Sequence, residues 1–218
     1  MSEPLPLAIL ISGRGSNMLA IAGACAAGTS GARVCCVLAD RPGTEGIERA
    51  AALGLPTSVL HFREFPDRAA FEAALAAAID ASGARLVALA GFMRILTPAF
   101  TARYAGRLLN IHPSLLPLHP GLDTHARALA AGEREAGASV HFVTEELDGG
   151  PVVLQARVPI QPGDTPDTLA ARVLRQECII YPLVIRWIAA GRLALVAGRP
   201  CLDDRELAKP LDLSQAPA

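Results

Sequence analysis

An asparagine and a histidine stand two positions apart where an aliphatic run ends, in the segment LLNIHPSLLP over residues 108–117. Side chains two apart on an extended strand point to the same side, so Asn110 and His112 can face one reacting atom together. The amide donates neutral hydrogen bonds, and an imidazole gives or takes a proton near neutral pH. This pair suits a carbonyl carbon under attack, whose oxygen becomes negative and needs donors about 3 Å away.

The acidic turn TEELDGGP, residues 144–151, offers a carboxylate to hold the histidine. Asp148 beside His112 would favour the charged imidazole and strengthen it as a general acid, and it can also accept a proton through water. The two glycines after it let the backbone come close to a ligand. The alternative is that Asn110 and Asp148 are ordinary turn residues and that His112 only satisfies nearby backbone groups.

A glycine-rich turn, SGRGSN over residues 12–17, follows an apolar run near the start of the chain. Backbone N–H groups at such a turn, together with a helix N-terminus, bind anions, so the turn predicts a phosphate on the ligand. Met18 stands where the dinucleotide fingerprint needs glycine, and no Lys-Ser/Thr pair follows as in a P-loop. The alternative is that the glycines only make the turn, with Ser16 or Asn17 capping the helix.

The elements that position these residues alternate between strand-length apolar runs and longer Ala-rich stretches, as in βαβ units. Strands are expected over residues 5–11, 32–40, 56–62, 84–92 and 107–112, with helices from about residue 16, over 44–54 and over 67–83. Two β-rich runs then flank the acidic turn like a hairpin, and a capped helix over about 165–189 precedes a short strand at 192–196.

This pattern predicts an α/β fold, a Rossmann-like open twisted sheet of mostly parallel strands with helices on both faces and an antiparallel C-terminal portion. We expect one domain over residues 1–197, followed by a loose tail at 198–218. Ligands of such sheets lie beyond the carboxyl ends of the strands, which is where Asn110 and His112 stand.

Bulk properties narrow the function. The formal net charge is −1 and the 20 Lys and Arg residues are scattered, which disfavours a nucleic-acid partner. The start, MSEPLPLAILISG, has no basic region and its apolar run is too short to span a bilayer, so no membrane partner is expected. Five cysteines without a C-x-x-C pair indicate reduced thiols and a cytoplasmic location.

Two further chemistries are weaker alternatives. Ser114 suggests a hydrolase nucleophile, but HPSLLP lacks the G-x-S-x-G elbow that exposes such a serine. A metal site built from His112, His119 and His125 is disfavoured by the proline-broken spacing and by the lack of an H-E-x-x-H helix. No metal is therefore expected.

Four segments together, LISGRGSN, LAGFMRIL, NIHPSLLP and SVHFVTEELDGGPV, resemble motifs of the phosphoribosylglycinamide formyltransferases, a family of folate-dependent formyltransferases. The resemblance runs from about Leu7 to Leu195, with the motifs in order and no large insertion. It implies transfer of the formyl group from 10-formyltetrahydrofolate, the co-substrate, to the amine of glycinamide ribonucleotide in de novo purine (IMP) biosynthesis. It also implies small-molecule partners and a monomer or homodimer.

The resemblance assigns roles to individual residues of this chain. The catalytic trio is Asn110, His112 and Asp148. The ribonucleotide phosphate falls at Gly15, Ser16 and Asn17, with Glu177 near the sugar. The folate falls at Arg68, Met93, Arg94, Ile95, Leu96, Asn110, Thr144, Glu145, Glu146, Leu147 and Asp148. Backbone groups of MRIL can read a pterin edge beside an apolar wall; the alternative is that Met93, Ile95 and Leu96 are plain core.

The chain departs from the family pattern at four positions, while the trio is intact. Arg14 stands where the family often has an amide-bearing or small residue, and Asp123 and Cys178 stand where it has histidines. Leu174 replaces a glutamine found in some relatives. These changes touch the rim and the ribose side, so they bear on substrate contacts more than on the chemistry.

Other functions remain as alternatives. Methionyl-tRNA formyltransferase and formyltetrahydrofolate hydrolase share the Asn-x-His and Asp chemistry, but each carries an additional domain for which 218 residues leave no room. A catalytically silent nucleotide-binding module is disfavoured, because a sensor does not need an oxyanion donor beside a proton source.

Overall fold

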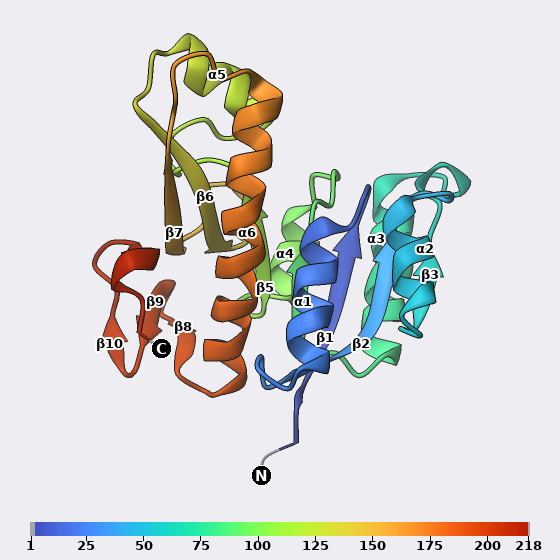
Figure 1. Ribbon diagram of the computed structural model, residues 1–218. Helices are drawn as coiled ribbons and strands as arrows, with labels where there is room; N and C mark the ends of the chain where they lie inside the picture. Colours follow the sequence, from blue (N-terminus) through green and yellow to red (C-terminus); the bar gives the residue numbers. More distant parts are fainter. Residues whose placement is uncertain (1–2, 218) are drawn as a thin grey trace. The chain divides into compact units, whose positions relative to one another are not determined.

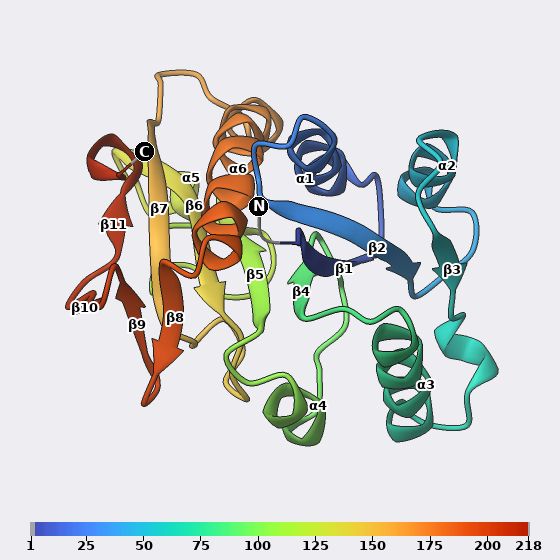
Figure 2. The same cartoon turned by 90° about the horizontal axis from the view of Figure 1, so that it is seen from below.

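The computed structural model describes residues 3–217 and divides into two compact units, Met1–Leu109 and Asn110–Ala218. The first unit holds β1 (Leu5–Ile11), α1 (Ser16–Ala26), β2 (Ala32–Ala39), α2 (Glu45–Ala52), β3 (Thr57–Val59), η1 (Phe62–Glu64), α3 (Arg68–Ala81), β4 (Leu86–Leu89) and α4 (Pro98–Arg103). Its strands are all parallel, in the order β4-β1-β2-β3. Figure 1 shows β1, β2 and β3, and β4 is labelled beside β1 in Figure 2.

Helices cover both faces of the sheet in the first unit, with α1 and α2 on one face and α3 and α4 on the other (Figure 2). This arrangement explains why β1 reads as an unbroken apolar run, since a strand covered on both faces buries every side chain. The side chains from Leu7 to Ile11 are all fully buried. α3 begins where the Asp67 side chain accepts a hydrogen bond from Ala70 N at 2.7 Å.

The second unit contains the remaining elements. β5 (Leu108–His112) crosses the boundary between the units, and α5 (Thr124–Ala130), β6 (Glu135–Phe142), β7 (Val152–Pro159), α6 (Pro166–Ala189), β8 (Leu193–Val196), β9 (Arg199–Leu202), β10 (Arg205–Glu206), β11 (Leu211–Asp212) and η2 (Leu213–Gln215) follow. Strands lie in the order β11-β7-β6-β5, with β6 antiparallel to β7, and α6 packs against both of these strands. A separate antiparallel sheet runs β10-β9-β8.

The α/β fold predicted from the sequence is confirmed, with mostly parallel strands and an antiparallel C-terminal portion. The predicted capping of α6 is also present, because Thr165 and Thr168 form a reciprocal capping box. The short helices α4 and α5 are additions that the sequence patterns did not indicate.

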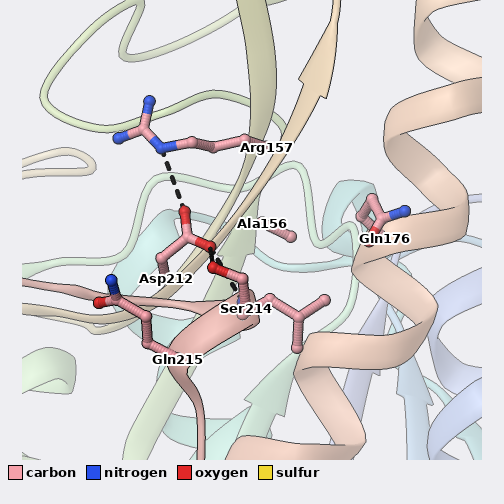
Figure 3. Close-up of a pocket in the computed structure, with 7 residues that line it drawn as sticks. Ala156, Arg157, Gln176, Asp212, Ser214 and Gln215 are labelled. Atoms are coloured by element: carbon pink, nitrogen blue, oxygen red, sulfur yellow. Dashed lines mark hydrogen bonds and ion pairs between the residues drawn. The ribbon is translucent and has the colours of Figure 1, made fainter.

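Residues 199–215, expected to belong to a loose tail, instead form three short strands and a 3-10 turn. Two kinds of contact hold this segment. Leu202 is buried, and Asp212 accepts hydrogen bonds from Arg157 Nε at 3.2 Å and from Ser214 N at 2.9 Å (Figure 3). Figure 3 shows the shallow pocket lined by Ala156, Arg157, Gln176, Asp212, Leu213, Ser214 and Gln215. Within residues 3–217, no helix is both long enough and apolar enough to cross a membrane.

Candidate active site

β5 delivers the predicted asparagine and histidine to one place. The apolar side chains of the strand, Leu108, Leu109 and Ile111, are buried and anchor it in the core. Asn110 and His112 alternate with Ile111 at its carboxyl end. The His112 side chain is itself only 7% exposed, and its Nδ1 lies 3.3 Å from Oδ2 of Asp148. His112 and Asp148, which are distant in the sequence, therefore lie close together, as the sequence pattern predicted.

The imidazole of His112 is held at both of its nitrogens. Nε2 lies 3.0 Å from the carbonyl oxygen of His119, and because a carbonyl only accepts, Nε2 carries a proton and donates it. Nδ1 faces the Asp148 carboxylate, which is also an acceptor. Two acceptors around one ring suit the doubly protonated imidazolium, which is the form that acts as a general acid.

Asp148 is the centre of the cluster. It adopts a left-handed backbone conformation with φ of 52°, and its Oδ2 accepts a hydrogen bond from Gly121 N at 2.8 Å. Asn110 Nδ2 donates to Oδ1 at 3.5 Å, at the long end of hydrogen-bond distances. The carboxylate thus touches both members of the β5 pair, and the acidic turn places it there.

Glycine is required in this acidic turn. The requirement lies at Gly150, where a Cβ would collide with the backbone carbonyl oxygen of Phe142, whereas a Cβ at Gly149 would meet only the exposed side chain of Glu146, which can move. The turn therefore passes close to the end of β6 at a distance that only glycine permits. The side chains of Glu145, Glu146 and Leu147 are exposed on the turn, and Thr144 is half-buried.

His141 is a member of the cluster that the sequence analysis missed. Its Nδ1 lies 3.0 Å from Phe142 O and donates to that carbonyl, so Nε2 of the neutral ring accepts from Asn110 Nδ2 at 3.1 Å. Burial lowers the pKa of His141, which keeps this ring neutral. The same Nε2 lies 3.8 Å from Asp148 Oδ1.

The signal for His141 in the sequence is weak. A histidine inside the apolar run SVHFV carries no motif, and its direction depends on a shift of register between Val140 and His141 on β6. Such a bulge turns a side chain away from regular alternation.

The donors of Asn110 and His112 point at protein acceptors within the cluster, namely His141, Asp148 and the His119 carbonyl. For either donor to reach a substrate oxygen, one of these acceptors has to be exchanged for that oxygen. Catalytic hydrogen bonds commonly tighten only when substrate is bound.

The glycine-rich turn lies in the first unit, before α1. Gly15 is the N-cap of α1 with φ of 75°, and no side chain caps the helix. The alternative in which Ser16 or Asn17 serves as the cap is therefore wrong. A Cβ at Gly15 would lie 2.8 Å from Gly46 Cα, and Gly46 N donates to Gly13 O at 3.0 Å. The starts of α1 and α2 are thus joined by direct backbone contact.

The segment of residues 93–96 divides between surface and core. Met93 and Ile95 are 59% and 58% exposed, whereas Leu96 is 8% exposed. The alternative that all three are plain core is wrong for the first two and right for Leu96. Arg68 lies at the start of α3, and a cavity of about 210 Å³ is lined by Phe62, Arg68, Phe71, Glu72, Met93, Arg94 and Ile95.

The residues predicted to bind the ribonucleotide and the folate are divided between the two units. Glu177 is buried on α6 in the second unit, whereas Gly15, Ser16 and Asn17 belong to the first. The expected folate residues likewise divide, with Arg68 and 93–96 in the first unit and 144–148 in the second.

Two further observations concern Ser114 and the residue types that ligate metals. The Ser114 hydroxyl donates to Leu118 O at 2.6 Å and so serves the loop after β5. Among residues 3–217, no group of three or more His, Cys, Asp or Glu side chains is arranged to hold a metal ion.

A mostly parallel α/β sheet, with an amide and an imidazole at the end of β5 and a carboxylate beside them from the turn after β6, is typical of enzymes that act at a carbonyl carbon. The formyl transferase family matches residues 5–185, and the chain belongs to this family.

Individual relatives agree with this membership. The chain is 51% identical to phosphoribosylglycinamide formyltransferase of Escherichia coli K12, covering 92% of this chain and 95% of that protein. It is 44% identical to the Haemophilus influenzae protein of the same name, covering 93% and 96%. The structure of the Coxiella burnetii phosphoribosylglycinamide formyltransferase superposes with a TM-score of 0.91 at 48% identity, covering 96% of this chain and all of that one.

Proposed function

We propose that Asn110, His112 and Asp148 are the catalytic residues of a phosphoribosylglycinamide formyltransferase. The enzyme transfers the formyl group of 10-formyltetrahydrofolate to the amine of glycinamide ribonucleotide in de novo purine biosynthesis. The observation that carries the assignment of residues is the 3.3 Å approach of Asp148 to His112 beside the Asn110 amide.

The chemistry follows from what each side chain can donate or accept. When the amine attacks the formyl carbon, the carbonyl electron pair moves onto oxygen, and Asn110 and the imidazolium of His112 stabilise that charge as donors. The attacking nitrogen becomes cationic, and Asp148 takes its proton through water. The adduct then collapses: the carbonyl re-forms, the bond to the folate nitrogen breaks, and that nitrogen receives through the water the proton that Asp148 had taken, so that tetrahydrofolate leaves.

The proposed ribonucleotide site is Gly15, Ser16 and Asn17, with Glu177 at the sugar. Support comes from the start of α1, where Gly15 in the left-handed region leaves the first N–H groups of an 11-residue helix without a side-chain cap. Uncapped helix N-termini attract phosphate through these groups and through the helix dipole.

The proposed folate site is Arg68, Met93 to Leu96, Asn110 and Thr144 to Asp148. The outward position of Met93 and Ile95 supports it, because two large apolar side chains more than half exposed offer a surface for a flat ring.

The test of the function is whether tetrahydrofolate release depends on the acceptor. We expect release from 10-formyltetrahydrofolate, followed by absorbance, to be rapid with glycinamide ribonucleotide and negligible with water alone. Formation of the N-formyl product, followed by mass spectrometry, should match it mole for mole. Equal release with and without the acceptor would establish a formyltetrahydrofolate hydrolase instead.

Substitution of Gly15 tests the phosphate site. Gly15→Ala places a methyl group against Gly46 at a positive φ, so we expect KM for the ribonucleotide to rise about 10-fold or more, corresponding to roughly 1.4 kcal/mol. KM for the folate should change less than about 2-fold. Gly28→Ala is the matched control, because its φ is 70° and nothing lies within 4 Å of the added Cβ. Equal effects of the two substitutions on KM would remove the phosphate from this turn.

We further propose that the enzyme works in the cytoplasm as a monomer or homodimer, with small molecules and not nucleic acid as partners. The net charge of −1 supports the absence of a nucleic-acid partner.

A further inference from the structure

A buried carboxylate lies directly after β2, in the first unit and away from the catalytic trio in the sequence. The side chain of Asp40 is 0% exposed, and its Oδ2 accepts a hydrogen bond from Arg94 Nε at 2.5 Å. Its other oxygen lies 3.4 Å from Arg41 Nε. A charge buried in this way is tolerated only when it is paired, so Asp40 and Arg94 fix each other's position.

The guanidinium of Arg94 is restrained on a second side. Its Cζ stands 4.2 Å from the centre of the Phe62 ring, in a cation–π contact. Phe62 is fixed in turn by an edge-to-face contact with Phe71 at 5.2 Å. Arg94 is therefore held between a buried anion and a packed aromatic ring, although its neighbours in the chain are exposed.

Polar groups also hold the two ends of the same segment. Met93 N donates to Ser12 Oγ at 2.8 Å, and Thr97 N donates to Glu72 Oε1 at 2.9 Å. These two bonds fix the backbone at Met93 and at Thr97, directly after the segment. Between them, Asp40 holds the side chain of Arg94. The exposed Met93 and Ile95 flank that fixed point.

We propose that Asp40 is a positioning residue for the formyl donor, which through Arg94 holds the backbone of residues 93–96 and the exposed Met93 and Ile95 in the conformation that receives the folate ring. The inference rests on the proposed folate site. A segment already held in its binding conformation loses less conformational freedom when the ligand arrives, and this raises affinity without a new contact. Asp40 does not touch the reacting atoms, so its loss should affect binding of the folate and not the chemical step.

The test is Asp40→Asn, which keeps the shape of the side chain and removes its charge. We expect KM for 10-formyltetrahydrofolate to rise about 10-fold, with kcat and KM for the ribonucleotide within about 2-fold of wild type. Calorimetric titration with tetrahydrofolate alone should show the same loss of affinity. A matched control is Asp164→Asn, which breaks another Asp–Arg pair, the partly buried one with Arg172 at the start of α6, and should leave both KM values unchanged.

A second variant separates positioning from simple loss of folding. Arg94→Met removes the partner, and the double variant Asp40→Asn/Arg94→Met leaves no unpaired charge; if Asp40 acts through Arg94, the double variant binds tetrahydrofolate no more weakly than Arg94→Met alone. Unchanged tetrahydrofolate affinity in Asp40→Asn, equal rises of both KM values, or additive losses in the double variant would each overturn the proposal. The titration does not use the formyl acceptor, so a failure of the proposed transfer reaction is seen separately in the wild-type assay.

Discussion

His112→Ala should lower kcat for formyl transfer by about 10²- to 10⁴-fold, because the substitution removes the proton donor at the developing oxyanion. Both nitrogens of His112 face acceptors, at 3.0 Å and 3.3 Å, whereas burial lowers the pKa of His141 and keeps that ring neutral. The measurement is turnover with both substrates saturating, alongside thermal unfolding followed by circular dichroism.

The matched control is His61→Ala, which removes an imidazole that is paired with Glu64 near the surface of the first unit. We expect this variant to keep wild-type turnover. Unaltered kcat in His112→Ala would defeat the catalytic assignment, and so would a loss of turnover that only follows a loss of folded protein.

Asp148→Asn should lower kcat by a comparable factor, roughly 10²- to 10³-fold, with smaller changes in either KM. An amide keeps an oxygen that can accept from Gly121 N, and Asn tolerates the φ of 52°, so the turn should keep its conformation. The negative charge beside His112 is lost, and with it the acceptor for the proton of the attacking amine. The measurement is a single-turnover experiment, which reports the chemical step directly.

Asp204→Asn is the control for this substitution. Asp204 is also an aspartate at positive φ, 61°, but it lies exposed in the turn between β9 and β10. Single-turnover rates should be unchanged there. If Asp148→Asn matches wild type in the same experiment, proton transfer does not pass through Asp148.

The sequence predicted the elements that depend on local patterns. β1 is a continuous apolar run, and β5 begins with buried leucines before its Asn-x-His pair. α6 starts with the Thr165 cap and a proline in its first turn. Each of these signals is contained in a few neighbouring residues. The short strands of residues 199–212 carry no such pattern. They form because they pair with one another, with β8 and with β7. The hydrophobic periodicity of a segment does not indicate which distant segment it pairs with.

The three residues proposed as catalytic could be predicted from the sequence as residue types, but their geometry could not. Asn110 and His112 share a strand face by simple alternation, whereas the approach of Asp148 depends on the path of the acidic turn and on the close passage of Gly150 by Phe142. His141 could not be identified from the sequence as a member of the cluster, because the direction of its side chain depends on a bulge on β6.

The exposure of Met93 and Ile95 could not be predicted from the sequence either. An apolar side chain fits a core or a ligand surface equally well by type. The structure shows that the segment carrying them is held by Ser12, Asp40 and Glu72, residues that are distant in the chain.

The backbone contact between Gly15 and Gly46 limits how the enzyme can be redesigned. Because Gly46 packs against Ile11, Gly13 and Gly15 with no space for a side chain, any residue larger than glycine at either position would force α1 and α2 apart. Engineering toward a bulkier acceptor therefore cannot enlarge the turn at its glycines. The exposed Arg14 and the half-buried Ser16 are the other positions of the turn between those glycines and the helix.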